Sequence, residues 1–370
     1  MAAGPVTLFL CGDVMLGRGV DQVLPHPGDP RLHERSVRDA RAYVRLAEEV
    51  HGPVPRPVAP SWPWGEALRV LDAAAPDVRI VNLETSVTRS DDFAPGKAVH
   101  YRMHPANLAA LTVARPDACV LANNHVLDLG VRGLLETLEV LEGAGLRGPG
   151  AGRDAAAAER PVVLPAGGNR RVLLVAAGSP SSGIPPHWAA GPHRPGVAYL
   201  PALTDAAADA LAERVRGLRR PGDVVVASLH WGSNWGWPVP EEQVRFAHRL
   251  VDGGVDVVHG HSSHHPRPIE VYRDRLVLYG CGDLVDDYEG IGGREQYRDD
   301  LRLAWFVTVD ADSGCLAGLR MVPLQARRLR LEPAAAEDVG WLAATLTRIS
   351  AGSASAIEPA ADGSLVLLAR

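Results

Sequence analysis

Lysine, closely spaced cysteines and long apolar runs are scarce in this 370-residue sequence. Lys97 is the only lysine, so the basic residues are almost all arginine, a bias that codon usage explains more simply than mechanism does. The formal net charge of −6 lacks the basic excess that broad binding of nucleic acid or anionic membranes requires. No window holds about 18 uninterrupted apolar residues, so we expect no transmembrane helix.

The four cysteines, Cys11, Cys119, Cys281 and Cys315, lie far apart and form no Cys-x-x-Cys pair. This spacing excludes a zinc ribbon and a thioredoxin-like redox site. Each cysteine lies in or beside an apolar run, which favours buried thiols in a reducing compartment. Residues 1–10 carry neither the basic nor the long apolar segment of a signal peptide, so we expect a cytoplasmic protein without a membrane anchor.

Apolar residues make up 46% of the chain and charged residues 22%, a composition that supports a sizeable core. Short apolar runs bounded by glycine, asparagine or aspartate predict buried strands. These runs lie at 6–10, 78–81, 118–121, 171–177, 224–229, 255–258 and 276–279. Helical patterns lie between them, at 133–143, 206–218 and 241–251. The alternation predicts a layered α/β fold.

Two proline-rich stretches interrupt this alternation. Residues 24–64 hold a helix-like segment, 37–50, among many prolines, and the stretch is either an insertion or lid, or a plain surface excursion. Residues 179–201 form a second proline-rich loop.

The end of the chain predicts an extension of the main domain. We expect one domain over 1–330, followed by a C-terminal extension over 331–370 that packs on the core. Within the extension, a helix is expected over 337–350 and a short strand over 365–368.

A set of polar residues follows directly, or almost directly, on the C-terminal ends of the apolar strands. They are Asp13, Glu84, Asn124, His125, His230, His261 and Asp283. Ligands bind at this edge of open α/β sheets, so we expect these side chains to gather there. Carboxylate and imidazole groups together suit ions such as Mn, Fe or Zn. Each residue alone has an ordinary structural role, but the set together predicts a metal site.

Five segments, in order, resemble motifs of the CapA family, which is associated with poly-γ-glutamate capsule synthesis. They read Gly-Asp-Val-Met-Leu-Gly-Arg at 12–18, Val-Asn-Leu-Glu-Thr at 81–85, Leu-Ala-Asn-Asn-His-Val-Leu-Asp-Leu-Gly at 121–130, His-Trp-Gly at 230–232 and Gly-His-Ser-Ser-His at 260–264. The family is similar to calcineurin-like metallophosphoesterases. The resemblance implies a four-layer αββα sandwich, with two mixed sheets flanked by helices.

The resemblance also implies roles for individual residues. The ligands of one or two divalent ions would be Asp13, Glu84, Asn124, His230, His261 and His264. His125 would donate a proton or stabilise the transition state. Metallophosphoesterases carry a histidine at the place of Met15, and a thioether is a poor ligand for hard divalent ions. The ion at that place would be completed by His265 or Asp283, or would be weak or absent.

Other residues would support this site. His259 would orient a ligand through its ring N–H, and Asp128 would orient His125 if a helix begins near Asn124. The candidates for substrate binding are Arg18, Arg102 and Trp231. A guanidinium fits carboxylate or phosphate, and an indole can wall a pocket. For these three residues a surface arginine or a merely packed ring is the alternative.

We therefore predict a metal-dependent hydrolase or transferase that attacks an amide or phosphoester through a metal-activated water. Its substrate would be a small or polymeric anion, of γ-glutamyl type or a specialised metabolite. The alternative is a non-catalytic accessory protein of poly-γ-glutamate synthesis that binds the polymer or a synthetase partner. A purely structural zinc site fits less well, because such sites close with four ligands and more candidates are present.

Overall fold

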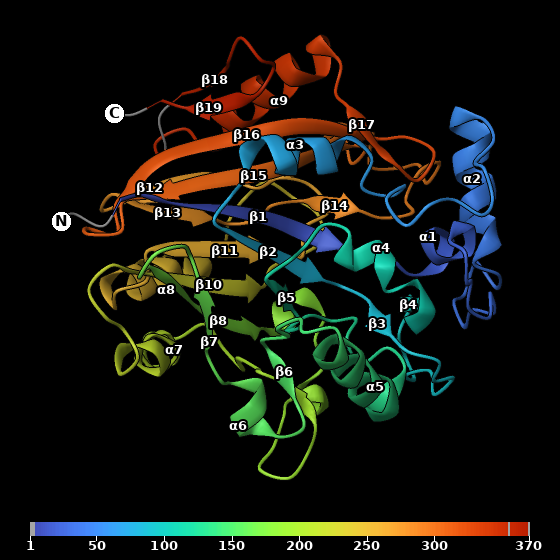
Figure 1. Ribbon diagram of the computed structural model, residues 1–370, viewed down its shortest axis with the longest axis horizontal. Coiled ribbons are helices and arrows are strands. Elements are labelled where there is room, and N and C mark those ends of the chain that lie inside the picture. Colours follow the sequence, from blue (N-terminus) through green and yellow to red (C-terminus); the bar gives the residue numbers. More distant parts are fainter. Residues whose placement is uncertain (1–3, 354–355, 369–370) are drawn as a thin grey trace.

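The computed structural model describes residues 4–353 and 356–368. Two mixed β-sheets stack face to face at its centre, and helices cover the outer face of each (Figure 1). This is the four-layer αββα arrangement that the family resemblance implied, so the prediction of fold class is confirmed.

The first sheet runs in the order β18-β19-β16-β15-β1-β2-β5, with β14 paired to β1 and β17 to β16. Its parallel members are β1 (Val6–Val14), β2 (Val78–Leu83), β5 (Ala118–Val120) and β14 (Asp283–Val285). Its antiparallel members are β15 (Leu301–Val309), β16 (Leu316–Ala326), β17 (Leu331–Pro333), β18 (Ile357–Pro359) and β19 (Leu365–Leu367). β14 takes over beside β1 beyond the point where β15 stops pairing with it.

The second sheet runs in the order β12-β13-β11-β10-β8-β7. Its parallel centre consists of β8 (Arg171–Gly178), β10 (Asp223–His230), β11 (Val257–His261) and β13 (Arg275–Leu278). Antiparallel edges are β7 (Val162–Pro165) and β12 (Ile269–Tyr272). Two small ribbons pair β3 (Ser86–Val87) with β4 (Arg102–Met103), and β6 (Ala151–Gly152) with β9 (Gly196–Val197).

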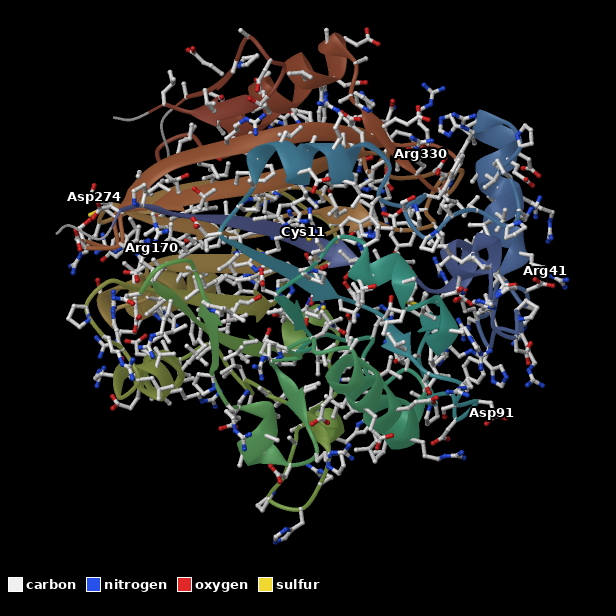
Figure 2. All side chains as sticks on the ribbon, viewed as in Figure 1. Cys11, Arg41, Asp91, Arg170, Asp274 and Arg330 are labelled. Carbon is white, nitrogen blue, oxygen red and sulfur yellow. The ribbon has the colours of Figure 1, made fainter. Side chains whose placement is uncertain are left out.

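Alternate residues of β1 face different layers, which explains its uninterrupted apolar run. Leu8 and Leu10 join the core between the sheets. Phe9 and Cys11 join the core under the outer helices, and Cys11 lies deep in the molecule (Figure 2). A strand that is buried on both faces shows no alternation of polar and apolar residues, so its sequence is a continuous apolar run.

Helices cover both sheets. Those over the first sheet are α1 (Arg18–Val23), α2 (Arg41–His51), α3 (Glu66–Ala74), α4 (Ala109–Thr112) and α5 (Gly130–Gly143). Those over the second are α7 (Asp205–Arg216) and α8 (Glu241–Asp252). The remaining helical segments are α6 (Ala155–Ala158), α9 (Ala336–Ile349), η1 (Pro105–Asn107), η2 (Pro180–Ser182), η3 (Pro186–Trp188) and η4 (Glu295–Tyr297).

Most helix boundaries lie close to those expected. The helix predicted over 37–50 begins only at Arg41, because Asp39 forms a turn whose carboxylate accepts the Arg41 N–H at 2.9 Å. Cys315 is half-buried rather than buried, because it lies in the turn between β15 and β16. Within the described residues, no helix is long and apolar enough to cross a membrane.

The C-terminal segment shares the main core. Apolar residues of α9 join the cluster between the sheets, and β19 pairs with β16 of the first sheet. The predicted boundary between 1–330 and 331–370 remains a prediction.

Candidate metal centre

The strand register brings polar residues of both sheets to one edge. In the first sheet, Asp13 on β1 lies opposite Asp283 on β14 and Asn82 on β2. In the second, His230 on β10 lies opposite His261 on β11. Asn82 donates a hydrogen bond of 2.7 Å to Asp13 Oδ1 and so fixes that carboxylate. The C-terminal ends of the parallel strands therefore converge, as the fold class requires.

Two overlapping groups of side chains have the composition of a metal site. Asp13, His230 and His261 present ligand atoms within 4.8 Å of one another, and so do Asp13, His264 and Asp283. All these side chains are buried, and Asp13 belongs to both groups. The geometry therefore offers two adjoining positions for a cation, with Asp13 between them.

Glu84 and Asn124 extend the first group. His230 Nε2 lies 3.0 Å from Asn124 Oδ1 and 3.7 Å from Glu84 Oε1. In the second group, His264 Nδ1 lies 3.0 Å from Asp283 Oδ1. The structure thus brings all the sequence-predicted ligands together, and their binding of metal stays a prediction.

The carboxylates of this centre are crowded and incompletely paired. Asp13 Oδ2, Glu84 Oε2 and Asp283 Oδ2 are buried with no hydrogen-bond partner among the described residues. Burial, and then the charge of Asp283, raises the pKa of Asp13 to about 7. Burial and the charge of Asp13 likewise raise the pKa of Glu84. Buried unpaired carboxylates are costly, so their arrangement fits a cation.

The imidazoles of the centre complement these carboxylates. Burial lowers the pKa of His230 and of His261 well below the usual value, so both rings are neutral and can offer a lone pair to a metal. Burial lowers the pKa of His264, but the charge and hydrogen bond of Asp283, together with the charge of Asp13, outweigh burial and raise the pKa of that ring. The donor set of carboxylate, amide and imidazole fits a divalent ion.

Met15 is not among the side chains that form the two candidate ligand groups. Its side chain is fully buried, and its Sδ accepts a contact of 3.9 Å from the Tyr288 hydroxyl. Of the two residues considered for the missing ligand, Asp283 joins the cluster. His265 instead stacks on Tyr297, with ring centroids 4.4 Å apart, and its Nδ1 lies 3.0 Å from the Pro266 carbonyl oxygen.

His259 lies behind the centre. Its Nε2 lies 2.8 Å from the Cys11 carbonyl oxygen, and its Nδ1 lies 3.1 Å from Ser228 Oγ. Ser228 Oγ in turn lies 2.9 Å from His261 Nε2. The Ser228 hydroxyl therefore links His259 to His261, and the two rings also lie edge to face with centroids 5.2 Å apart.

His125 faces the centre on one side and a carboxylate on the other. Its Nδ1 lies 2.6 Å from Asp128 Oδ2, and its Nε2 lies 3.6 Å from Glu84 Oε1. Burial lowers the pKa of His125 to about 4, although the charge of Asp128 opposes this. Asp128 reaches the ring without a helix at Asn124, because a turn joins His125 to Asp128 and α5 begins only at Gly130.

The two arginines proposed for substrate are already engaged. Arg18 is buried; its Nε donates to Asp287 at 3.1 Å and its Nη1 to Glu34 at 3.3 Å. Arg102 donates to the carbonyl oxygens of Ser90 and Asp29. Both guanidinium groups therefore already have hydrogen-bond partners within the chain.

Trp231 lies in the core rather than on a pocket wall. Its side chain is 2% exposed, donates to the Tyr279 carbonyl oxygen at 3.0 Å and packs near Phe246. Trp235, four residues further on, lies beside His264 with ring centroids 5.3 Å apart. An alternating strand sends the first tryptophan inward, whereas the loop that follows carries the second to the site.

Lys97 was not predicted as a site residue. Its Nζ lies 2.5 Å from Asp128 Oδ1 and 3.3 Å from His125 Nδ1, and it also donates to the Asn124 carbonyl oxygen. The ammonium group lies 5.0 Å from the Trp188 ring. The only feature of the sequence that singled out Lys97 was that it is the only lysine, and this did not indicate a chemical role.

Comparison with known proteins gives several matches. The model of the family described as "Bacterial capsule synthesis protein PGA_cap" matches residues 7–288. A "Probable polyglutamine synthesis accessory protein" of Mycobacterium tuberculosis is 54% identical over 354 residues, which cover 95% of this chain and 93% of that protein. "Capsule biosynthesis protein CapA" of Bacillus anthracis is 23% identical over 286 residues, which cover 76% of this chain and 60% of that protein.

Solved structures show more distant likeness. A phosphatase of Mycoplasma pneumoniae aligns with a TM-score of 0.47 and 12% identity, covering 88% of this chain and 95% of that one. A 5'-nucleotidase precursor of Thermus thermophilus aligns with a TM-score of 0.46 and 16% identity, covering 93% and 58%. The sequence matches are far stronger and agree with the motifs. The chain belongs to the bacterial capsule synthesis protein family PGA_cap.

Proposed function

We propose that this protein is a metal-dependent hydrolase or transferase that acts on an amide or phosphoester of an anionic substrate. The observation that carries the proposal is the set of three buried carboxylate oxygens without hydrogen-bond partners, on Asp13, Glu84 and Asp283. Neutral imidazoles lie directly beside them. Such a site is costly in the absence of a cation and well suited to hold one.

Two positions for a divalent ion share Asp13. His230 and His261 would serve the first, with Glu84 and Asn124 close by. His264 and Asp283 would serve the second. Mn, Fe and Zn all accept this mixture of oxygen and nitrogen ligands. Asp283 supplies the donor that Met15 does not.

A divalent ion bound here would act as a Lewis acid and provide a hydroxide nucleophile near neutral pH. His125 would move a proton at Nε2, the ring nitrogen that faces Glu84 and the centre. Asp128 would hold the ring through Nδ1 and stabilise the cationic form. Asn82 would keep the Asp13 carboxylate in one orientation through its hydrogen bond.

A second function has support from one relative. The protein of Mycobacterium tuberculosis that is 54% identical carries the name of a polyglutamine synthesis accessory protein. This favours the alternative that the chain assists polymer synthesis without catalysis, by binding the polymer or a synthetase partner. A polymer that binds without being cleaved would support the alternative over hydrolysis.

Metal binding tests the proposal most directly. The full chain is stripped with a chelator, reconstituted with Mn, Fe or Zn and analysed for bound metal. We expect one or two ions per chain, fewer in the His264→Ala variant and an unchanged number in the His265→Ala control. These neighbours differ because His264 joins the ligand cluster and His265 stacks on Tyr297. A wild-type protein that retains no metal would refute the proposal.

Turnover is then assayed with phosphoesters beside γ-glutamyl and peptide amides. Activity that depends on metal and falls in the His125→Ala variant supports hydrolysis at this centre. A metal-loaded protein that is inert toward the whole panel but retains poly-γ-glutamate would favour the accessory function.

A further inference from the structure

A cavity of about 520 Å³ opens beside the metal centre and shares His264 with it. Two loops and two helices contribute to its other walls: Trp235 follows β10, Tyr288 and Arg294 follow β14, Arg18 begins α1, and Tyr43 lies on α2. This volume lies in the range of small-molecule sites. The cavity is thus the natural place for the part of a substrate that flanks the reacting group.

The contact between cavity and centre is close. His264 Nε2 lies 2.9 Å from Asn234 Nδ2, and its ring lies 5.3 Å from the Trp235 ring and 5.1 Å from the Tyr288 ring. The aromatic rings therefore form a wall that reaches the candidate ligand itself. A ligand of the cavity would lie against His264 on one side and the rings on the other.

Two charged side chains of the cavity wall make no ion pair among the described residues. Arg294 touches the Gly293 carbonyl oxygen at 3.4 Å and lies 5.2 Å from the Trp235 ring. Asp299 also lines the cavity. Within residues 4–353 and 356–368, neither Arg294 nor the Asp299 carboxylate forms an ion pair. The third charged wall residue, Arg18, is neutralised by Asp287 and Glu34.

The neighbouring arginines form their ion pairs with other carboxylates. Arg302 pairs with Asp286 at 2.5 Å and donates to the Asp299 backbone oxygen. Arg298 pairs with Asp300 and Asp338. Burial raises the pKa of Asp299, and the charge of Arg302 opposes this only in part, so a cationic partner in the cavity would lower that pKa further.

We propose that this cavity binds the zwitterionic head group of an α-amino acid or of a substrate that ends in one, with Arg294 taking the carboxylate and Asp299 the ammonium. The proposal rests on the proposed function, because His264 is both a candidate metal ligand and part of the cavity wall. A purely anionic ligand satisfies Arg294 but meets the like charge of Asp299, whereas a zwitterion pairs with both. Trp235 and Tyr288 would contact the apolar part of such a ligand.

Three probes of nearly equal size isolate the two charges. They are L-phenylalanine, N-acetyl-L-phenylalanine, which keeps only the carboxylate, and L-phenylalaninamide, which keeps only the ammonium. Binding is measured by calorimetry on the full chain after removal of metal, because amino acids chelate metals. We expect saturable binding of phenylalanine, at least about tenfold tighter than binding of either analogue.

Variants assign each charge. Arg294→Gln should abolish the preference for phenylalanine over its amide, and Asp299→Asn should abolish the preference over the N-acetyl analogue. Arg298→Gln is the matched control, since this arginine lies on the same segment but pairs with Asp300 and Asp338. A thermal melt of each variant verifies that it folds. Absence of saturable binding, or an N-acetyl analogue that binds as tightly as phenylalanine, overturns the proposal.

The outcome is separable from that of the proposed function. A chain that prefers the zwitterion but retains no metal after reconstitution keeps the cavity assignment and loses the hydrolase. A chain that binds metal and hydrolyses a substrate without any preference among the three probes loses only the cavity assignment.

Discussion

Replacing His259 with glutamine should change how the stability of this protein depends on pH. The ring is fully buried, between the Cys11 carbonyl oxygen and the Ser228 hydroxyl. Burial lowers its pKa to about 4. The same ring in an unfolded chain has a pKa of about 6.5. The folded protein therefore keeps His259 neutral over a range in which the unfolded chain protonates it.

The size of the effect follows from these two values. Between about pH 6.5 and about pH 4 the unfolded state binds more protons, so the free energy of unfolding falls as the pH falls. A displacement from about 6.5 to about 4 amounts to about 3 kcal/mol, because each pKa unit corresponds to about 1.4 kcal/mol. On acidification to about pH 4.5, this ring should lower the free energy of unfolding of the wild-type protein by about 2.5 kcal/mol. The His259→Gln variant lacks the ring and should not show this loss.

Urea unfolding of both chelator-treated proteins, at several values of pH, measures this difference. Near neutral pH the variant should be the less stable, because glutamine replaces a fitted ring. That deficit should shrink by about 2.5 kcal/mol on acidification to about pH 4.5. His193→Gln, which removes a histidine at an exposed position, is the control. A constant deficit for His259→Gln would refute the assignment of a buried neutral ring.

Three further predictions concern the centre. Lys97→Met leaves Asp128 buried without its cation, so urea unfolding should show a loss of about 3 kcal/mol, of which Lys97→Arg recovers part; an unchanged stability contradicts the ion pair. Gly12→Ala places a Cβ 1.7 Å from the Gly282 carbonyl oxygen and must push β14 away from β1, so calorimetry should show weakened metal binding. The control is Gly318→Ala, whose Cβ would meet nothing within 4 Å and which should bind metal as the wild type does. A metal at 100 times its Kd adds about 2.7 kcal/mol to the free energy of unfolding, so a chelator should lower Tm by a few degrees in a thermal scan; an unchanged Tm would contradict a metal site.

The fold was largely predictable because its strands are buried on both faces. The runs at 171–177 and 224–229 became the centre of the second sheet, and the helix expected at 241–251 is α8. What the pattern could not predict was the length of β1. It extends to Val14 because β14 pairs with its end, and that neighbour lies about 270 residues away in the chain.

The same reasoning explains the site. Asp13, His230 and His261 were predictable because each marks the end of a parallel strand. The choice between Asp283 and His265 was not, since it depends on which residue of a distant segment pairs with β1. Trp231 follows β10 directly and packs in the core, which is the alternative that the sequence left open for it.

Met15, which follows β1, is a poor ligand for a hard ion, whereas Asp283 on β14 adds a carboxylate, so these two residues affect the charge of the centre as well as its ligands. Asp13, Glu84 and Asp283 bring three carboxylates to one buried place. Two divalent ions would outweigh these carboxylates by one charge and would leave the centre attractive to hydroxide and to an anionic reacting group. The metal-free centre would repel the same groups. Attraction of an anion to the centre should therefore depend on the metal, whereas recognition in the neighbouring cavity depends on Arg294 and Asp299 and should not.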